Sequence, residues 1–159
     1  ENELTDNLVS NNKLGMCLKA SSYNKLSGND ANMNSKYGVY LGNSMNNVLS
    51  ANRITSNSEC GVFLLDSENN SIYNNYFNNS NNIYLNDIDS DNSLNTTKTQ
   101  GINIIGGPYL GGNFWAAPDG NGFSLVQTDL NGDGICDAVY TAGNGTIDYL
   151  PLAGSGVMN

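Results

Sequence analysis

An acidic loop near the end of the chain carries the residues best suited to chemistry, and it reads Asp129-Leu130-Asn131-Gly132-Asp133-Gly134-Ile135-Cys136-Asp137. Calcium takes oxygen ligands, and EF-hand loops supply them from positions 1, 3, 5, 7 and 9, with Gly at position 6. The spacing predicts a Ca2+ site formed by Asp129, Asn131, Asp133, the carbonyl of Ile135, and Asp137. Position 12 is Tyr140, so the loop is no complete EF-hand, and Asp148 or Asp119 would complete the shell. The alternative is a turn rich in Asx hydrogen bonds that holds no ion.

A second acidic group consists of Asp66 and Asp87, which are 21 residues apart. If the chain forms stacked β-coils of about that length, the two carboxylates lie about 4.8 Å apart and raise each other's pKa or share a cation. Retaining glycosidases hold their acid and nucleophile about 5–5.5 Å apart, so the pair is a candidate catalytic site. The alternatives are a cation site and a solvated acidic edge. The few basic residues are dispersed, which argues against the Lys or Arg base of a polysaccharide lyase.

A third candidate is an aromatic column formed by Tyr40, Phe63 and Tyr84, which Cys17 precedes at the same spacing. On the outside of a coil these rings would form an apolar strip able to stack on sugar rings or to pack against another chain. The alternative is that a loop or the C-terminal segment covers the strip.

These groups need elements that bring them together, and the sequence supplies them as an internal repeat. The pattern Asn-x-(Leu or Ile)-x-x-Asn recurs every 22 or 23 residues, and a second block ending in Leu recurs in step at residues 15–18, 38–41, 61–64 and 82–85. A small or apolar position lies between the blocks, at Val9, Ala31, Ile54, Phe77 and Thr99. Each repeat therefore contains three short strands without a helix, which predicts an all-β parallel β-helix, or solenoid, of four to five coils over residues 1–105.

Stacked coils place equivalent residues in columns. Asn fills two of them, at 2, 24, 47, 70 and 92 and at 7, 29, 52 and 75, where amide ladders are expected at the corners of the coils. Leu or Ile fills two inward columns, at 4, 26, 49, 72 and 94 and at 18, 41, 64 and 85. Outward, Glu3 is expected beside Lys25 and Asp30 beside Arg53.

The repeat fades near residue 105, and residues 106–159 contain the only Trp and all three Pro. A solenoid exposes its core at its last coil unless other sequence covers it, so this segment is predicted to be a cap that carries the calcium loop. The cap offers bulky side chains at Tyr109, Phe114, Trp115, Phe123, Tyr140 and Tyr149. At the other end the sequence is already in phase with the repeat at Asn2. We therefore expect further coils or another protein subunit to cover the first coil.

Composition excludes several functional classes. The net charge is −9 with six Lys plus Arg, which disfavours nucleic acid and anionic membranes as partners. No apolar run approaches the roughly 20 residues that span a bilayer, so no membrane insertion is expected within this chain. About 30 Asn and 18 Gly make a helical bundle untenable. The cysteines at 17, 60 and 136 fall at different coil positions and are expected to be free thiols.

The Asn-rich coils and the tail together resemble a known family. The tail motifs are Gly112-Asn113-Phe114-Trp115, Asp129 to Asp137, Tyr140, and Asp148-Tyr149-Leu150-Pro151-Leu152. They are similar to the NosD-like β-helix proteins, whose repeats are shared with carbohydrate-binding proteins and sugar hydrolases, and which are abundant on the surfaces of methanogenic archaea. The resemblance implies a right-handed helix in an extracellular or cell-surface setting, but it fixes no activity. The copper role of NosD finds no support in a chain without His.

Two functions follow as hypotheses. The first is a non-catalytic cell-surface module for structural assembly or carbohydrate binding, with other surface-protein subunits, further coils or polysaccharide as partners. The second is a glycoside hydrolase or lyase domain, or a fragment of one, that acts on polysaccharide through Asp66 and Asp87.

Overall fold

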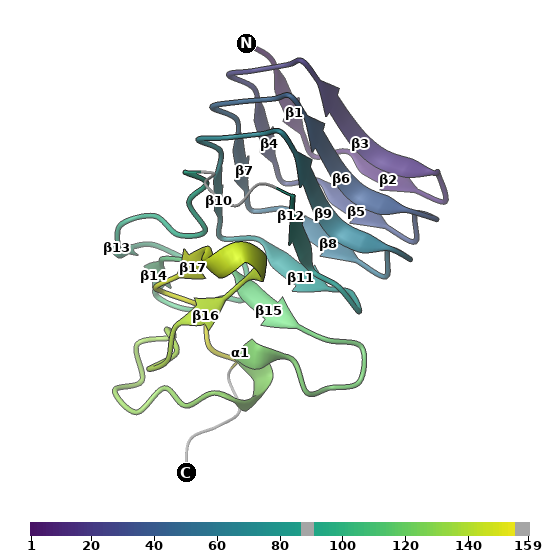
Figure 1. Cartoon of the computed structure of the whole chain (residues 1–159). Helices are drawn as coiled ribbons and strands as arrows, with labels where there is room; N and C mark the ends of the chain where they lie inside the picture. The colour runs from purple at the N-terminus through teal and green to yellow at the C-terminus, as the bar shows by residue number, and fades with distance from the viewer. Residues whose placement is uncertain (87–90, 155–159) are drawn as a thin grey trace.

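The computed structural model describes residues 1–86 and 91–154, and it confirms an all-β parallel solenoid. Four successive coils of three strands each stack along one axis, with β1 at one end and the C-terminal strands β16 and β17 toward the other (Figure 1). Many of the short strands end at a residue with positive φ, such as Asp6, Asn11 and Asn74. Asn and Asp adopt this left-handed conformation more readily than other non-glycine residues, which suits an Asn-rich sequence to many tight corners.

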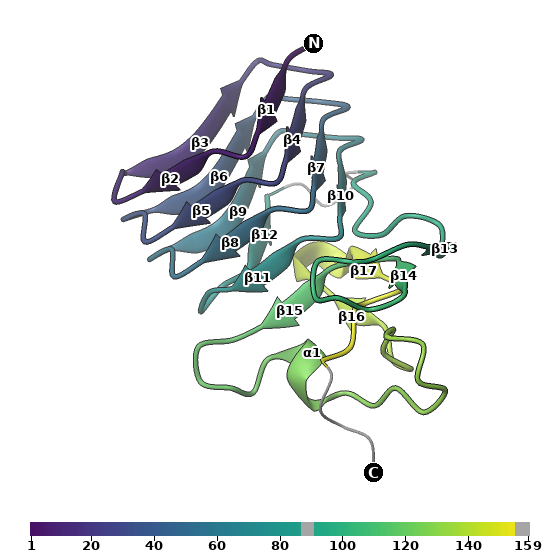
Figure 2. The ribbon, with the colours of Figure 1, turned by 180° about the vertical axis from the view of Figure 1, so that it is seen from behind.

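The strands form three parallel sheets along the solenoid (Figure 2). The first contains β1 (Glu3–Thr5), β4 (Lys25–Ser27), β7 (Val48–Ser50) and β10 (Ser71–Tyr73). The second contains β2 (Leu8–Ser10), β5 (Asp30–Asn32), β8 (Arg53–Thr55), β11 (Tyr76–Asn78) and β15 (Phe114–Ala116). The third contains β3 (Leu14–Lys19), β6 (Tyr37–Gly42), β9 (Cys60–Leu65) and β12 (Ile83–Leu85).

The register between coils is the one that the repeat predicts. Glu3 pairs with Lys25 across adjacent strands, and their side chains form an ion pair of 3.8 Å. Both side chains are at least half exposed, so this pair adds little stability. Asp30 and Arg53 are also neighbours across β5 and β8, but the Arg53 guanidinium lies over the ring of Tyr76, 4.6 Å from its centre.

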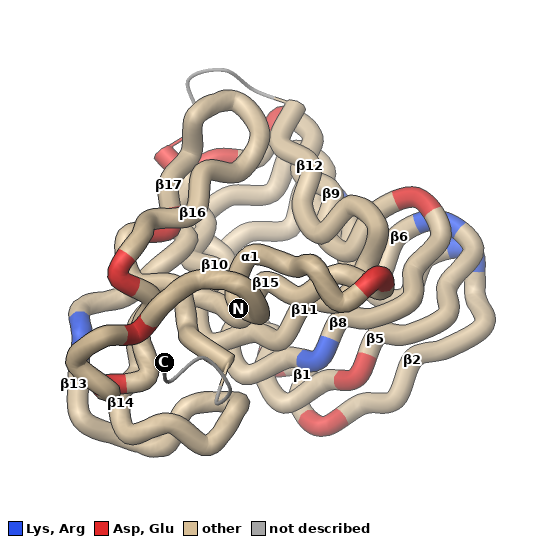
Figure 3. The backbone as a smooth tube through the Cα atoms, turned by 90° about the horizontal axis from the view of Figure 1, so that it is seen from below, with Lys and Arg blue, Asp and Glu red and all other residues tan. Residues whose placement is uncertain are grey.

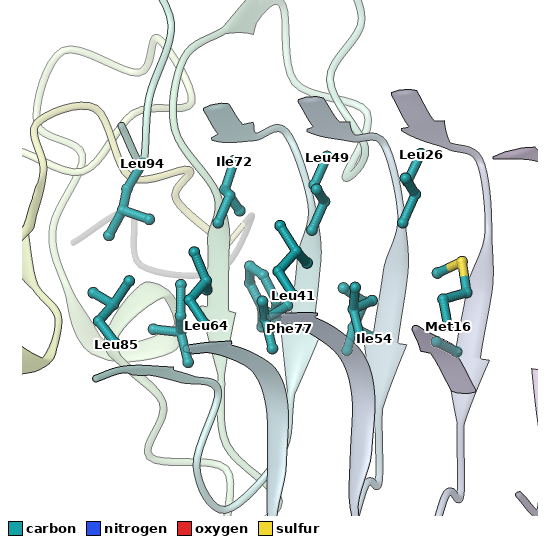
Figure 4. Close-up of a cluster of buried hydrophobic side chains, with 14 of the residues drawn as sticks. Met16, Leu26, Leu41, Leu49, Ile54, Leu64, Ile72, Phe77, Leu85 and Leu94 are labelled. Atoms are coloured by element: carbon teal, nitrogen blue, oxygen red, sulfur yellow. The ribbon is translucent and has the colours of Figure 1, made fainter. Parts of the chain in front are cut away.

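The inward columns form the core, as expected. Leu26, Leu49, Ile72 and Leu94 are fully buried in one row, with Leu18, Leu41, Leu64 and Leu85 in a second row (Figure 4 shows most of them). Each leucine therefore packs on the equivalent residue of the next coil, so burial depends on coils stacking in register.

The fifth repeat departs from the prediction after Leu94. Asn92 and Leu94 take their expected places, but Thr99 is exposed on the short strand β13 (Thr99–Gln100), which pairs antiparallel with β14 (Tyr109–Leu110). Trp115 of β15 occupies the predicted place of Thr99, because β15 pairs in parallel with β11 and sets Trp115 beside Phe77. An insertion between Leu94 and Asn113 thus lengthens the fifth coil, and a fixed period cannot reveal where that coil resumes.

The remaining elements pack against the last coil. They are α1 (Phe123–Val126), β16 (Tyr140–Thr141), the 3-10 turn η1 (Gly143–Gly145) and β17 (Ile147–Asp148). Trp115 stacks on Phe77 at 4.7 Å between ring centres, and Tyr140 stacks on Trp115 at 4.3 Å. This aromatic stack continues the core beyond the last leucines and closes that end of the solenoid. No helix of the described residues is long and apolar enough to cross a membrane.

Candidate functional site

The acidic loop is held by hydrogen bonds to its own backbone. Asp129 accepts hydrogen bonds from the N–H groups of Asp133 (3.1 Å) and Gly134 (2.7 Å). Asp137 accepts from the N–H of Leu130 at 3.0 Å, and Asn131 Oδ1 accepts from the N–H of Asp133 at 3.0 Å. These are Asx-type turns, in which side-chain oxygens stabilise a loop locally.

A lysine from outside the loop neutralises its central carboxylate. Asp133 forms an ion pair with Lys98, whose ammonium group also lies 4.6 Å from the ring centre of Tyr109. Burial acts to raise the pKa of Asp133, but the hydrogen bond from Lys98 outweighs it and the pKa lies below its ordinary value. The loop thus uses a cation of the protein itself.

Asp148 lies fully buried beneath the cap. Its Oδ2 accepts hydrogen bonds from the backbone N–H of Asn113 (2.8 Å) and from Nε1 of Trp115 (2.9 Å), and its Oδ1 accepts from the N–H of Leu150 (3.0 Å). Burial raises the pKa of Asp148 to about 6, although these three donors act to lower it. Asp148 therefore joins the cap to the last coil.

The predicted calcium site is wrong. In residues 1–86 and 91–154 no three or more His, Cys, Asp or Glu side chains are grouped so that they could hold a metal ion. The spacing from Asp129 to Asp137 matches a calcium loop, but several of its side-chain oxygens accept N–H groups, and Asp133 pairs with Lys98. Asp119 caps its own turn by accepting from the N–H of Asn121.

The second acidic group is only partly described. Asp66 is exposed at the corner that follows β9, where its φ is +47°, and Glu68 nearby is also exposed. Asp87 lies outside the described residues, so the separation of the two carboxylates stays a prediction. Figure 3 shows acidic side chains spread around the outline of the described tube, with the few basic ones standing apart.

The aromatic column forms a continuous row on the outer face of the third sheet. Tyr40 and Phe63 stack at 5.8 Å between ring centres, and Phe63 and Tyr84 at 5.0 Å. Tyr37 joins this row, 4.6 Å from Phe63. Buried Gly38 and Val39 separate Tyr37 from Tyr40, so strict alternation fails and both rings reach the outside. The period does not reveal Tyr37, because Leu14 and Cys60 occupy its column in the neighbouring coils.

The rings of the row lie within 20° of parallel, so they stack mainly on one another. Stacking of this kind covers part of each ring face between its neighbours. Tyr84, at the last described position of the row, is 44% exposed. We refer below to Tyr37, Tyr40, Phe63 and Tyr84 as the aromatic row.

Three amide ladders run along the corners of the solenoid. In almost every step, one Asn donates its backbone N–H and its side-chain amide to Oδ1 of the Asn in the next coil, at 2.8–3.2 Å. Two ladders contain the predicted columns, and the second continues from Asn75 to Asn113. The third joins Asn12, Asn34, Asn57, Asn79 and Asn82, and the sequence analysis missed it although its residues follow the same period.

A glycine column makes room for the third ladder. A Cβ at Gly38 would lie 2.7 Å from Nδ2 of Asn57 and 2.8 Å from the carbonyl oxygen of Gly61. Real Cβ atoms essentially never approach this closely, so the residue here must be glycine for the amide to fit against the strand.

Comparison with known proteins assigns the chain to a family. The family model described as "Periplasmic copper-binding protein (NosD)" matches residues 1–120, which include all four complete coils and the strand β15. The chain belongs to the NosD family. No curated protein and no solved structure matches it. The similarity to archaeal surface proteins stays a prediction, because the family match names no organism.

The described residues of this NosD-family chain do not fit a copper ion. Copper sites use His, Cys and Met ligands, but the chain has no His. Its three cysteines are free and lie in separate places: Cys17 is exposed on β3, Cys60 is buried on β9 and Cys136 is buried in the cap. Burial raises the pKa of the Cys60 and Cys136 thiols to about 12, so neither offers a thiolate ligand at neutral pH.

Proposed function

We propose that this NosD-family chain is a non-catalytic structural module of the cell envelope, which holds the groups joined to its two ends at a fixed separation. The observation that carries the proposal is the set of three amide ladders, which tie every coil to the next at three corners. The description of the family as periplasmic supports a place in the cell envelope, at or outside the cell surface.

The ladders support rigidity because their amides are buried and paired. Asn47, Asn52 and Asn70 are fully buried, and each both accepts from the coil before it and donates to the coil after it. Breaking one coil away from the next would leave such groups without partners, at a cost of about 1–3 kcal/mol for each buried group. A solenoid built this way resists bending between coils.

A distance measurement between the two ends tests the proposal. One spin label is attached to Cys17, which is exposed in the first coil, and another to Tyr149→Cys, at an exposed position in the cap. Double electron–electron resonance should give one narrow distance distribution. A broad distribution, with a narrow one for a control pair within a single coil, would contradict a rigid spacer. Release of reducing ends from polysaccharides would contradict the non-catalytic part, and Asp66→Asn would show whether Asp66 is responsible.

Carbohydrate binding by the aromatic row is the second candidate, and the exposed Tyr84 at the last described position of the row favours it. A free ring face can stack on the apolar face of a sugar. A glycan array should then show a ligand whose binding Tyr84→Ala abolishes. Tyr23→Ala is the matched control, because Tyr23 is 64% exposed and lies outside the row. Equal binding by both variants would exclude the row as the site.

A further inference from the structure

The first coil presents an unpaired face across the solenoid axis. Strands β1, β2 and β3 are each the terminal strand of their sheets. Between them lies an open hollow of about 480 Å3, lined in part by the core residues Leu4, Val9 and Met16. Leu4 and Val9 are only partly buried, whereas the equivalent residues of the second coil, Leu26 and Ala31, are fully buried. This face thus exposes a section of the apolar core.

The amide ladders give this face a direction. Within each ladder the donors point toward the C-terminal coils and the Oδ1 acceptors point back. The Oδ1 atoms of Asn24, Asn29 and Asn34 accept from the first coil. Among the described residues, the Oδ1 atoms of Asn2, Asn7 and Asn12 receive no donor. The first coil therefore offers three acceptors at fixed corners around an apolar centre.

The opposite end of the solenoid is closed in a complementary way. Asn113 ends the second ladder, and its backbone N–H donates to the buried carboxylate of Asp148. Its amide donates to the carbonyl oxygens of Ile72 and Leu94. The cap thus satisfies the last donors of this ladder, while the acceptors at the first coil have no such partner in the described chain.

We propose that the first coil is a docking face for a further coil of the same repeat, in parallel register, whose three corner Asn residues donate to Asn2, Asn7 and Asn12. A second copy of the chain does not fit this face. Its own first coil would bring ladder acceptors against ladder acceptors, and its other end is closed by the cap. The inference deepens the proposed structural role, because it identifies the partner that extends the solenoid.

The test adds one coil to the chain. In the first fusion a copy of residues 24–46 replaces Glu1 directly before Asn2, which preserves the 23-residue spacing of the three Asn columns. In the control fusion, the copies of Asn24, Asn29 and Asn34 are Ala. A second fusion uses residues 47–69 in the same place, in case the first added coil folds poorly.

The docked coil should lower the unfolding equilibrium constant, measured by urea denaturation, by about 100-fold or more, since it forms several buried hydrogen bonds and covers the apolar centre. The Ala control should lose most of that gain. If neither fusion gains stability, or the Ala control gains as much, the proposal is overturned. Sedimentation of the unmodified chain should show a monomer, and a dimer dissociated by Leu4→Asp would assign the face to a second copy instead. The spin-label distance reads rigidity separately, so either proposal can fail alone.

Discussion

Replacement of Asn52 by Ala tests whether the amide ladders stabilise the solenoid. Asn52 is fully buried in the third coil. Its Oδ1 accepts from the backbone N–H of Asn29 at 3.0 Å and from the Asn29 amide at 2.9 Å. Its amide donates to the carbonyl oxygen of Leu26 at 2.8 Å and to Oδ1 of Asn75 at 2.9 Å. Ala removes all four hydrogen bonds.

The expected cost follows from these contacts. At about 1 kcal/mol for each lost hydrogen bond, Asn52→Ala should lower the free energy of unfolding by about 4 kcal/mol. The backbone N–H of Asn29 would be left buried without its acceptor, which places the loss among the larger effects of a single substitution. Asn2→Ala is the matched control, because Asn2 is exposed and its side chain donates only to Oδ1 of Asn24. The control should cost about 1 kcal/mol or less.

Equilibrium urea denaturation followed by far-ultraviolet circular dichroism measures both values. Asn52→Asp, which keeps the shape and the acceptor but loses the amide donors, separates hydrogen bonding from packing. It should be more destabilising at neutral pH than at acid pH, because a buried carboxylate facing two acceptors is tolerated only when protonated. If Asn52→Ala costs no more than Asn2→Ala, the ladders do not stabilise the fold and our reasoning on rigidity fails.

Three further predictions concern other features of the fold. Gly38→Ala should cost about 2 kcal/mol by crowding Asn57, whereas Gly143→Ala, with open space around it, should change the urea midpoint little; equal effects would disprove the close-packing explanation. Because burial raises the pKa of Asp148 to about 6, the folded state binds this proton more tightly than the unfolded state does. Unfolding free energy should therefore fall by about 3 kcal/mol from pH 4 to pH 7 relative to Asp148→Asn, and parallel pH profiles would contradict this. A thiol reagent should modify Cys17 in the folded protein but reach Cys60 and Cys136 only after urea unfolding, and rapid reaction of all three would show that the core is open.

The repeat in the sequence predicts the register of the solenoid because one geometric rule governs it. Residues 22 or 23 apart lie side by side in every complete coil, as Leu26 and Leu49 do. The same rule predicted the Asn ladders at Asn24 and Asn47, since an amide can both accept and donate along a column. A third ladder through Asn34 and Asn57 follows the same rule and could have been predicted too.

The fifth coil shows where the rule ends. An insertion changes the spacing from Asn75 to its ladder partner Asn113 to 38 residues, so a search at a fixed period selects Thr99 and misses Trp115. Trp115 takes the core position because its ring stacks on Phe77, a contact that depends on space at the end of the solenoid and not on distance along the chain.

The sequence by itself determined the architecture of this protein, because the burial of a periodic apolar column has only one solution once the period is known. Only the tertiary structure decided the chemistry of the acidic loop. The spacing from Asp129 to Asp137 is the same whether the side-chain oxygens converge on an ion or accept backbone N–H groups, and Lys98, which pairs with Asp133, is 35 residues away in the chain. A local motif fixes which ligands are available, whereas their direction and their charge partners depend on segments that the fold brings together.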